Sequence, residues 1–106
     1  MIKDLLTLGD TVELMNSKDY RDRFVAEYIQ TALRYEKLRT FNQRLVAADL
    51  TKRLEPEHNC PTEYLFDQED AMHKYLRILE TRAIIEDIDL SDAIASLVRK
   101  HKSRVV

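Results

Sequence analysis

Mostly apolar and aromatic side chains recur every three or four residues along the first half of the chain. Such spacing places them on one face of an α-helix. No Gly or Pro occurs from Asp10 to Glu55, so the pattern predicts a long helix over residues 17–50, with Asn16 or Ser17 as its N-cap. The stripe comprises Tyr20, Phe24, Tyr28, Thr31, Tyr35, Leu38 and Leu45.

The polar Asn42 fills the one gap of seven residues in this stripe. An Asn within a helical seam can fix register or oligomeric state at a cost in stability. An Asn at the solvent margin of the stripe is the alternative, and the sequence leaves both open.

A second stripe predicts a second long helix over residues 61–87. Pro61 is expected at its first helical position, with Cys60 or Asn59 as the cap, and the segment 87–90 is expected to end it. The stripe comprises Leu65, Gln68, Met72, Tyr75, Leu76, Leu79 and Ala83.

Shorter elements are predicted at both ends of the chain. Residues 1–14 resemble a broken helix in which Gly9 suits a C′ position and Asp10 with Glu13 a capping pair. Ser91 is expected to cap a short helix over residues 91–103, whose basic tail (99–104) is predicted to fray.

Charge divides the two long helices. Lys18 to Arg53 holds nine basic and five acidic residues, whereas Glu55 to Asp92 holds three basic and eleven acidic residues. Both prolines lie between the halves, in the segment 55–61. The sequence therefore predicts one all-α domain over residues 1–106: an antiparallel hairpin of two long helices that attract each other, flanked by short helices.

Composition limits the cellular compartment and the class of binding partner that the chain can be expected to have. A single Cys fits a reducing compartment, and no apolar stretch approaches the roughly 20 residues that span a bilayer. We therefore expect a soluble, cytoplasmic protein without membrane contact. The net charge of −2 offers no general attraction for nucleic acid.

Motifs for catalysis, cofactors and metals are missing from the sequence. One glycine cannot build a phosphate-binding loop, and no Gly-flanked Ser nucleophile occurs. Asp70 and His73 share one helix face, but helical di-iron sites need two such pairs and further carboxylates. His58 and Cys60 make at most half a zinc site. We therefore expect no enzyme, no cofactor and no metal.

Arginine and tyrosine residues on the two helices are the candidate ligand site. Guanidinium groups bind phosphate bidentately, and aromatic rings stack on bases. Pairing of the arginines with Glu27, Glu80 and Glu86 is the structural alternative. The candidate residues are Arg34, Tyr35, Tyr28, Arg77 and Arg82.

A second candidate surface is acidic and could mimic a phosphate backbone. Asp67, Asp70 and Asp89 belong to the acidic second half of the chain. An acidic run is more often a solvated face or the partner of a basic helix, and this chain contains such a helix.

Residues 15–28 and the stretch from Arg34 to Leu38 resemble short uncharacterised proteins of phages and prophages of low-GC Gram-positive bacteria. So does the later stretch that contains Cys60-Pro61, Ala71-Met72 and Ile88-Asp89-Leu90. Those proteins are labelled as related to an open reading frame of a crAss-like gut phage. The resemblance covers about residues 15–90 and leaves residues 1–14 as an N-terminal extension.

The resemblance implies a phage accessory protein that counters host immunity by binding. In its most concrete form, an oligomer sequesters an anionic nucleotide immune signal between its helices. The alternatives are an anti-CRISPR type of inhibitor that occludes a host defence nuclease with its acidic helix, and a structural adaptor.

Overall fold

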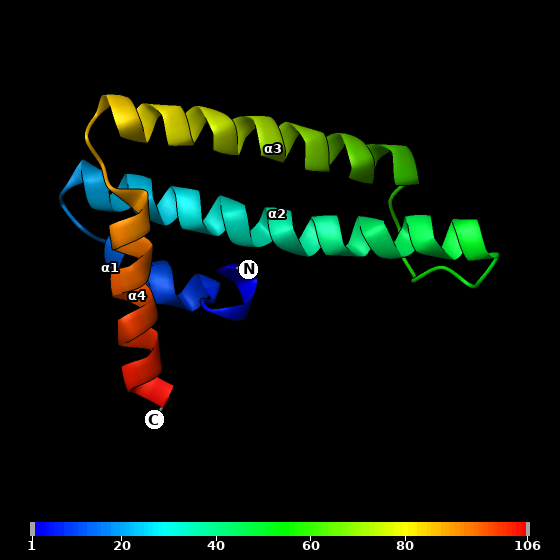
Figure 1. Cartoon of the computed structure of the whole chain (residues 1–106), viewed down its shortest axis with the longest axis horizontal. Helices are drawn as coiled ribbons and strands as arrows, with labels where there is room; N and C mark the ends of the chain where they lie inside the picture. The colour runs from blue at the N-terminus through cyan, green and yellow to red at the C-terminus, as the bar shows by residue number, and fades with distance from the viewer. Residues whose placement is uncertain (1, 106) are drawn as a thin grey trace.

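The computed structural model describes residues 2–105, whose regular elements are all helices with no strand among them, which confirms the all-α prediction (Figure 1). The molecule measures 48 × 36 × 20 Å. None of the helices in this part of the chain is long and apolar enough to cross a membrane. In chain order the elements are η1 (Ile2–Asp4), η2 (Leu8–Thr11), α1 (Val12–Met15), α2 (Tyr20–Thr51), α3 (Thr62–Ile85) and α4 (Leu90–Val105).

Helix α2 is the centre of the molecule. Helix α3 returns antiparallel along one side of it, whereas the N-terminal elements and α4 contact it from the other side (Figure 1). The α4 helix crosses the N-terminal half of α2, so the opposite end of the hairpin is left without a covering element (Figure 1). The predicted hairpin of α2 and α3 is therefore only part of the fold, and the N-terminal elements and α4 complete it.

The start of α2 differs from the predicted one. Asp19 is the N-cap, and its carboxylate accepts a hydrogen bond from the Arg21 N–H at 3.0 Å. Ser17, one of the two predicted caps, instead donates its hydroxyl proton to Asp22 at 2.7 Å. Asp, Asn and Ser cap helices almost equally well, so residue type alone does not separate the positions.

Predicted caps elsewhere also shift by one or two residues. Pro61 occupies the N-cap position of α3 rather than the first helical position. The N–H of Asp92 donates to the Asp89 carboxylate at 2.9 Å, and α4 begins at Leu90 ahead of the predicted cap Ser91.

The N-terminal break is capped differently from the prediction. Thr7 and Asp10 form a capping box around η2, so Asp10 accepts from Thr7 rather than pairing with Glu13. Gly9 lies inside η2 without a positive φ, and the predicted C′ role is wrong.

Two apolar clusters explain why the predicted α2 stripe is only partly buried. Tyr20 is 48% exposed although it belongs to the stripe. The helix buries one face against α3 and a second face against α4 and the N-terminal segment. The first cluster is Phe24, Leu79 and Ala83, and the second is Leu6, Val25, Ile29, Leu33 and Leu97.

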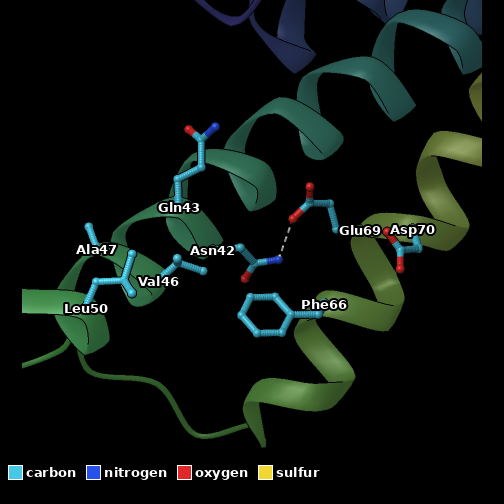
Figure 2. Close-up of a pocket in the computed structure, with 8 residues that line it drawn as sticks. All are labelled: Asn42, Gln43, Val46, Ala47, Leu50, Phe66, Glu69 and Asp70. Atoms are coloured by element: carbon cyan, nitrogen blue, oxygen red, sulfur yellow. Dashed lines mark hydrogen bonds between the residues drawn. The ribbon is translucent and has the colours of Figure 1, made fainter.

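Asn42 lies inside the seam between α2 and α3, as the first of its two readings proposed. Its side chain is 2% exposed and donates to the Leu65 carbonyl at 3.1 Å and to the Glu69 carboxylate at 2.8 Å (Figure 2). Its carbonyl oxygen is buried and has no partner among the described atoms. Asn42 therefore fixes the register of the two helices at the expense of one unpaired acceptor.

The basic tail is helical, which corrects the prediction that it frays. His101 contacts Asp10 at 3.0 Å and Arg104 contacts Glu13 at 3.2 Å. These contacts fasten the last turns of α4 to the N-terminal segment, so both ends of the chain form one packed layer against α2.

Asp10 makes the attachment of this layer dependent on pH. Burial by itself raises the pKa of Asp10, but hydrogen bonds from the Thr7 N–H, His101 and the Thr7 hydroxyl outweigh it and leave the pKa below its ordinary value of 3.8. A carboxylate with a depressed folded-state pKa stabilises the fold above its unfolded pKa, and this contribution disappears as the pH falls through the folded pKa.

We expect Asp10→Asn to lower the free energy of unfolding by about 1.5 kcal/mol at neutral pH, the value of a charge-assisted hydrogen bond. The difference from the unaltered protein should disappear at a pH well below 3.8, where both side chains are uncharged. Urea unfolding at both pH values measures it, and a difference that persists in acid would contradict the assignment.

Candidate ligand-binding crevice

One crevice of about 590 Å³ lies between α2, α3, the N-terminal segment and the start of α4. Its lining residues on each helix are three or four positions apart, which places them on one face. Ile2, Leu5 and Ile94 close it from the N-terminal segment and α4. Its aromatic and polar lining residues are Tyr28, Tyr35, Glu36, Arg39, His73, Arg77 and Glu80.

Tyr28 and Glu80 join the two helices across the crevice. The Tyr28 hydroxyl donates to the Glu80 carboxylate at 2.8 Å. Burial raises the pKa of Tyr28 and the hydrogen bond to Glu80 raises it further. The phenol therefore stays protonated and holds the Glu80 carboxylate in place.

Tyr35 and His73 form a second contact between α2 and α3. Their ring centroids are 5.8 Å apart with the planes tilted by 36°, and the Tyr35 hydroxyl lies 3.4 Å from Nδ1 of His73. The two rings thus present a partly exposed aromatic wall to the crevice.

Glu36 is an acidic group whose hydrogen bonds are made within the chain. Its carboxylate is 8% exposed and accepts from the backbone N–H of Ile2 at 3.1 Å and of Lys3 at 2.8 Å. These bonds attach η1 to α2 and compensate much of the cost of burying the charge.

Arg39 and Arg77 supply the positive charge of the crevice. Both are exposed, and within residues 2–105 neither guanidinium makes a hydrogen bond or an ion pair. The predicted Arg77–Glu80 pair is absent among these residues, and Glu80 accepts from Tyr28. Two forked donors are therefore available to an anion at this site.

The crevice brings together three of the five predicted ligand-binding residues: Tyr28, Tyr35 and Arg77. Arg34 is exposed on α2 but does not line the crevice. At about 100° per residue, its side chain points roughly 100° away from that of Tyr35. The expected Arg34–Glu27 pair is replaced by a hydrogen bond from the Tyr75 hydroxyl to Glu27.

Arg82 has the structural role that the alternative reading proposed. Its guanidinium contacts the Glu86 carboxylate at 3.1 Å and lies 4.9 Å from the centre of the Phe24 ring. The cation–π contact covers the edge of the apolar cluster between α2 and α3. Arg82 does not line the crevice.

Arg39 and His73 are crevice residues that were not assigned a ligand-binding role from sequence. Arg39 follows Tyr35 by four residues, and His73 precedes Arg77 by four. This i,i+4 spacing is a signal that could have found both, once Tyr35 and Arg77 were chosen.

The three candidate acidic residues do not form one patch. Asp67 and Asp70 are exposed near the start of α3, and about 27 Å of helix separates Asp67 from the end of α3 at Ile85. Asp89 lies beyond that end and caps α4. A nucleic-acid mimic would have to present acids along this length, where Lys74, Arg77 and Arg82 intervene.

The remaining candidate chemistry lies in the connection between α2 and α3. His58 contacts the Cys60 carbonyl at 2.7 Å and the Glu55 carboxylate at 3.2 Å, and these two bonds raise the pKa of His58. Cys60 is exposed. No group of three or more His, Cys, Asp or Glu side chains in the described part of the chain is arranged to hold a metal ion.

Comparison with known proteins gives one family. No curated protein and no solved structure matches the chain. A family model described as Sequestin matches residues 18–85, which is more than half of the chain and includes the whole of α2 and α3. The matched region contains all the polar and aromatic residues of the crevice. The chain therefore belongs to the Sequestin family.

Proposed function

We propose that this protein sequesters an anionic nucleotide immune signal in the crevice between α2 and α3, as a non-enzymatic phage accessory protein that counters host immunity. The family name is consistent with sequestration. The proposal assigns binding to the crevice and no chemical reaction. The crevice is formed within one chain, so each subunit would carry a complete site.

The observation that carries the proposal is the division of charges in the crevice. Glu36 and Glu80 accept hydrogen bonds from groups of the same chain, whereas Arg39 and Arg77 have no such partner among the described residues. An anion that enters would meet two guanidinium forks, which suit the geometry of phosphate.

The aromatic wall supports the choice of a nucleotide over a simple anion. A base can stack on Tyr35 or His73, and such stacking contributes about 1–3 kcal/mol per base in proteins that bind single strands. A volume of about 590 Å³ lies within the range of small-molecule sites.

A thermal melt of the purified protein with a panel of linear and cyclic nucleotides tests the proposal. A ligand that binds only the folded state stabilises it by about 2.7 kcal/mol at a hundredfold excess over its dissociation constant. We expect a rise in melting temperature with at least one phosphorylated nucleotide and none with the matching nucleoside, since the arginines recognise phosphate.

A flat panel would contradict nucleotide sequestration and favour the protein-directed alternative. The partner would then be a host defence protein that contacts Asp67 and Asp70. Charge reversal at these two exposed positions, followed by pull-down from host lysate, would test that reading.

A further inference from the structure

A groove of about 510 Å³ lies at the end of the hairpin remote from α4 (Figures 1 and 2). Helix α2 contributes Val46, Ala47 and Leu50, and α3 contributes Phe66, which together make its apolar surface. The acidic Glu69 and Asp70 line the groove on its α3 side, at the end where Asn42 lies (Figure 2). The groove shares no lining residue with the ligand-binding crevice.

The adjoining tip of the hairpin has the complementary character. Leu50 is 75% exposed and Leu54 is 99% exposed, so both leave apolar surface uncovered at this tip. The basic residues Lys52 and Arg53 lie between them in the chain. Residues 52–54 therefore form a knob that combines the apolar Leu54 with positive charge, and this knob adjoins the apolar groove, which Leu50 lines and which carries negative charge.

The knob cannot fill the groove of its own chain. Lys52 ends α2 in the left-handed conformation, and the Arg53 N–H closes the turn on the Ala48 carbonyl. The chain then passes along a neighbouring face of α2, where Arg53 and Leu54 lie beside Arg44 and Thr51. A knob and a groove on different faces of one chain can meet only between two copies.

We propose that a second copy of this chain occupies the groove, in a two-fold symmetric dimer centred near Ala47. The small Ala47 side chain lets two antiparallel α2 helices approach closely at the axis. At about 1.5 Å per residue, the end of α2 at Thr51 lies roughly 6 Å along the helix direction from Ala47, and Arg53 turns back beside it. An antiparallel partner brings Arg53 to the level of positions 42–43, where Glu69 and Asp70 line the groove.

This arrangement makes the two contacts of the dimer identical, as a two-fold axis requires. Leu50 and Leu54 of each copy cover apolar surface of the other, and Arg53 of each copy faces Asp70 of the other. The proposed dimer is independent of nucleotide binding, because the crevice is complete in one chain.

Sedimentation velocity over a wide range of protein concentrations tests the proposal. We expect a reversible dimer in the unaltered protein. The double variant Leu50→Gln/Leu54→Gln should raise the dimer dissociation constant by about 30-fold or more, as loss of an interface hot spot does. Both side chains are exposed in the single chain, so the melting temperature at low concentration should change little.

The matched control is Ile84→Gln/Ile85→Gln, which replaces two side chains of similar exposure (79% and 73%) at the far end of α3. It should leave the dimer unchanged. A chain that stays monomeric at every concentration would overturn the proposal. So would a dimer that the control variant weakens and the Leu50/Leu54 variant does not, since that would place the interface on α3.

A charge exchange tests the orientation of the two copies. Arg53→Asp and Asp70→Arg should each weaken the dimer, and the combined variant should recover most of the affinity because the pair is restored with opposite sign. If the losses of dimer affinity in the two single variants simply add in the combined variant, Arg53 and Asp70 do not face each other and the proposed orientation is wrong. Nucleotide-induced shifts in melting temperature should persist in all of these variants.

Discussion

Deletion of residues 90–106 is expected to remove about 5 kcal/mol or more from the free energy of unfolding and to leave little folded protein. Ile29 and Leu33 are 0% and 1% exposed, and Leu97 of α4 packs against them. Burial of each such side chain contributes about 1.5–3 kcal/mol. The free energy of unfolding of a whole domain is only about 5–15 kcal/mol, so exposing this cluster to water removes most of it.

Urea unfolding followed by circular dichroism measures this loss. The control is deletion of residues 102–106 alone, which retains Leu97 and the His101–Asp10 contact. Among the ion pairs and side-chain hydrogen bonds of the described residues, the contact of Arg104 with Glu13 is the one then lost, and an exposed ion pair contributes about 1 kcal/mol or less. A longer deletion that unfolds at the same urea concentration as the intact chain would contradict the role assigned to α4.

This first prediction also bears on the family. Residues 90–106 lie outside the segment that matches the Sequestin model. If α4 is required for folding, residues 18–85 do not fold by themselves in this chain. The flanking residues then complete the apolar core.

Replacing both crevice arginines is expected to abolish nucleotide binding if the proposed function holds. Arg39→Ala with Arg77→Ala removes two charge-assisted contacts of about 1.5–3 kcal/mol each. We therefore expect the dissociation constant to rise about a hundredfold or more, and the shift in melting temperature to vanish. The fold should persist, because neither arginine has a partner within the described residues.

The matched control is Arg34→Ala with Lys37→Ala. It removes the same amount of positive charge from exposed positions of α2 that do not line the crevice. Titration calorimetry with the nucleotide found in the melting panel separates the two variants. Equal losses in both would show that the ligand responds to overall charge, and would contradict binding between Arg39 and Arg77.

The comparison of Arg34 with Arg77 shows how far the sequence could lead. Both follow from the same pattern of arginine beside an aromatic seam, and only one lines the crevice. Helical periodicity gives the relative positions of side chains on one helix, but not the rotation of that helix toward its neighbours. Glu80 could pair with Arg77 by spacing alone, yet in the folded chain it accepts from Tyr28, 52 residues away.

The sequence by itself determined the features that depend on neighbouring residues. The two long helices, the connection near Pro61 and the break before α4 agree with the predicted elements, because periodicity, proline and capping act over a few residues. The short connection between the two helices also favoured the antiparallel hairpin, whereas the predicted charge attraction forms no ion pair between α2 and α3 within residues 2–105.

Only the tertiary structure decided which faces of α2 are covered. The helix carries apolar side chains on two faces, and a single stripe cannot describe a helix that packs against α3 on one side and α4 on the other. The same packing leaves Leu54 uncovered and orders a basic tail that was expected to fray. These outcomes depend on contacts between residues far apart in the chain, and such contacts form only when all the helices share one core.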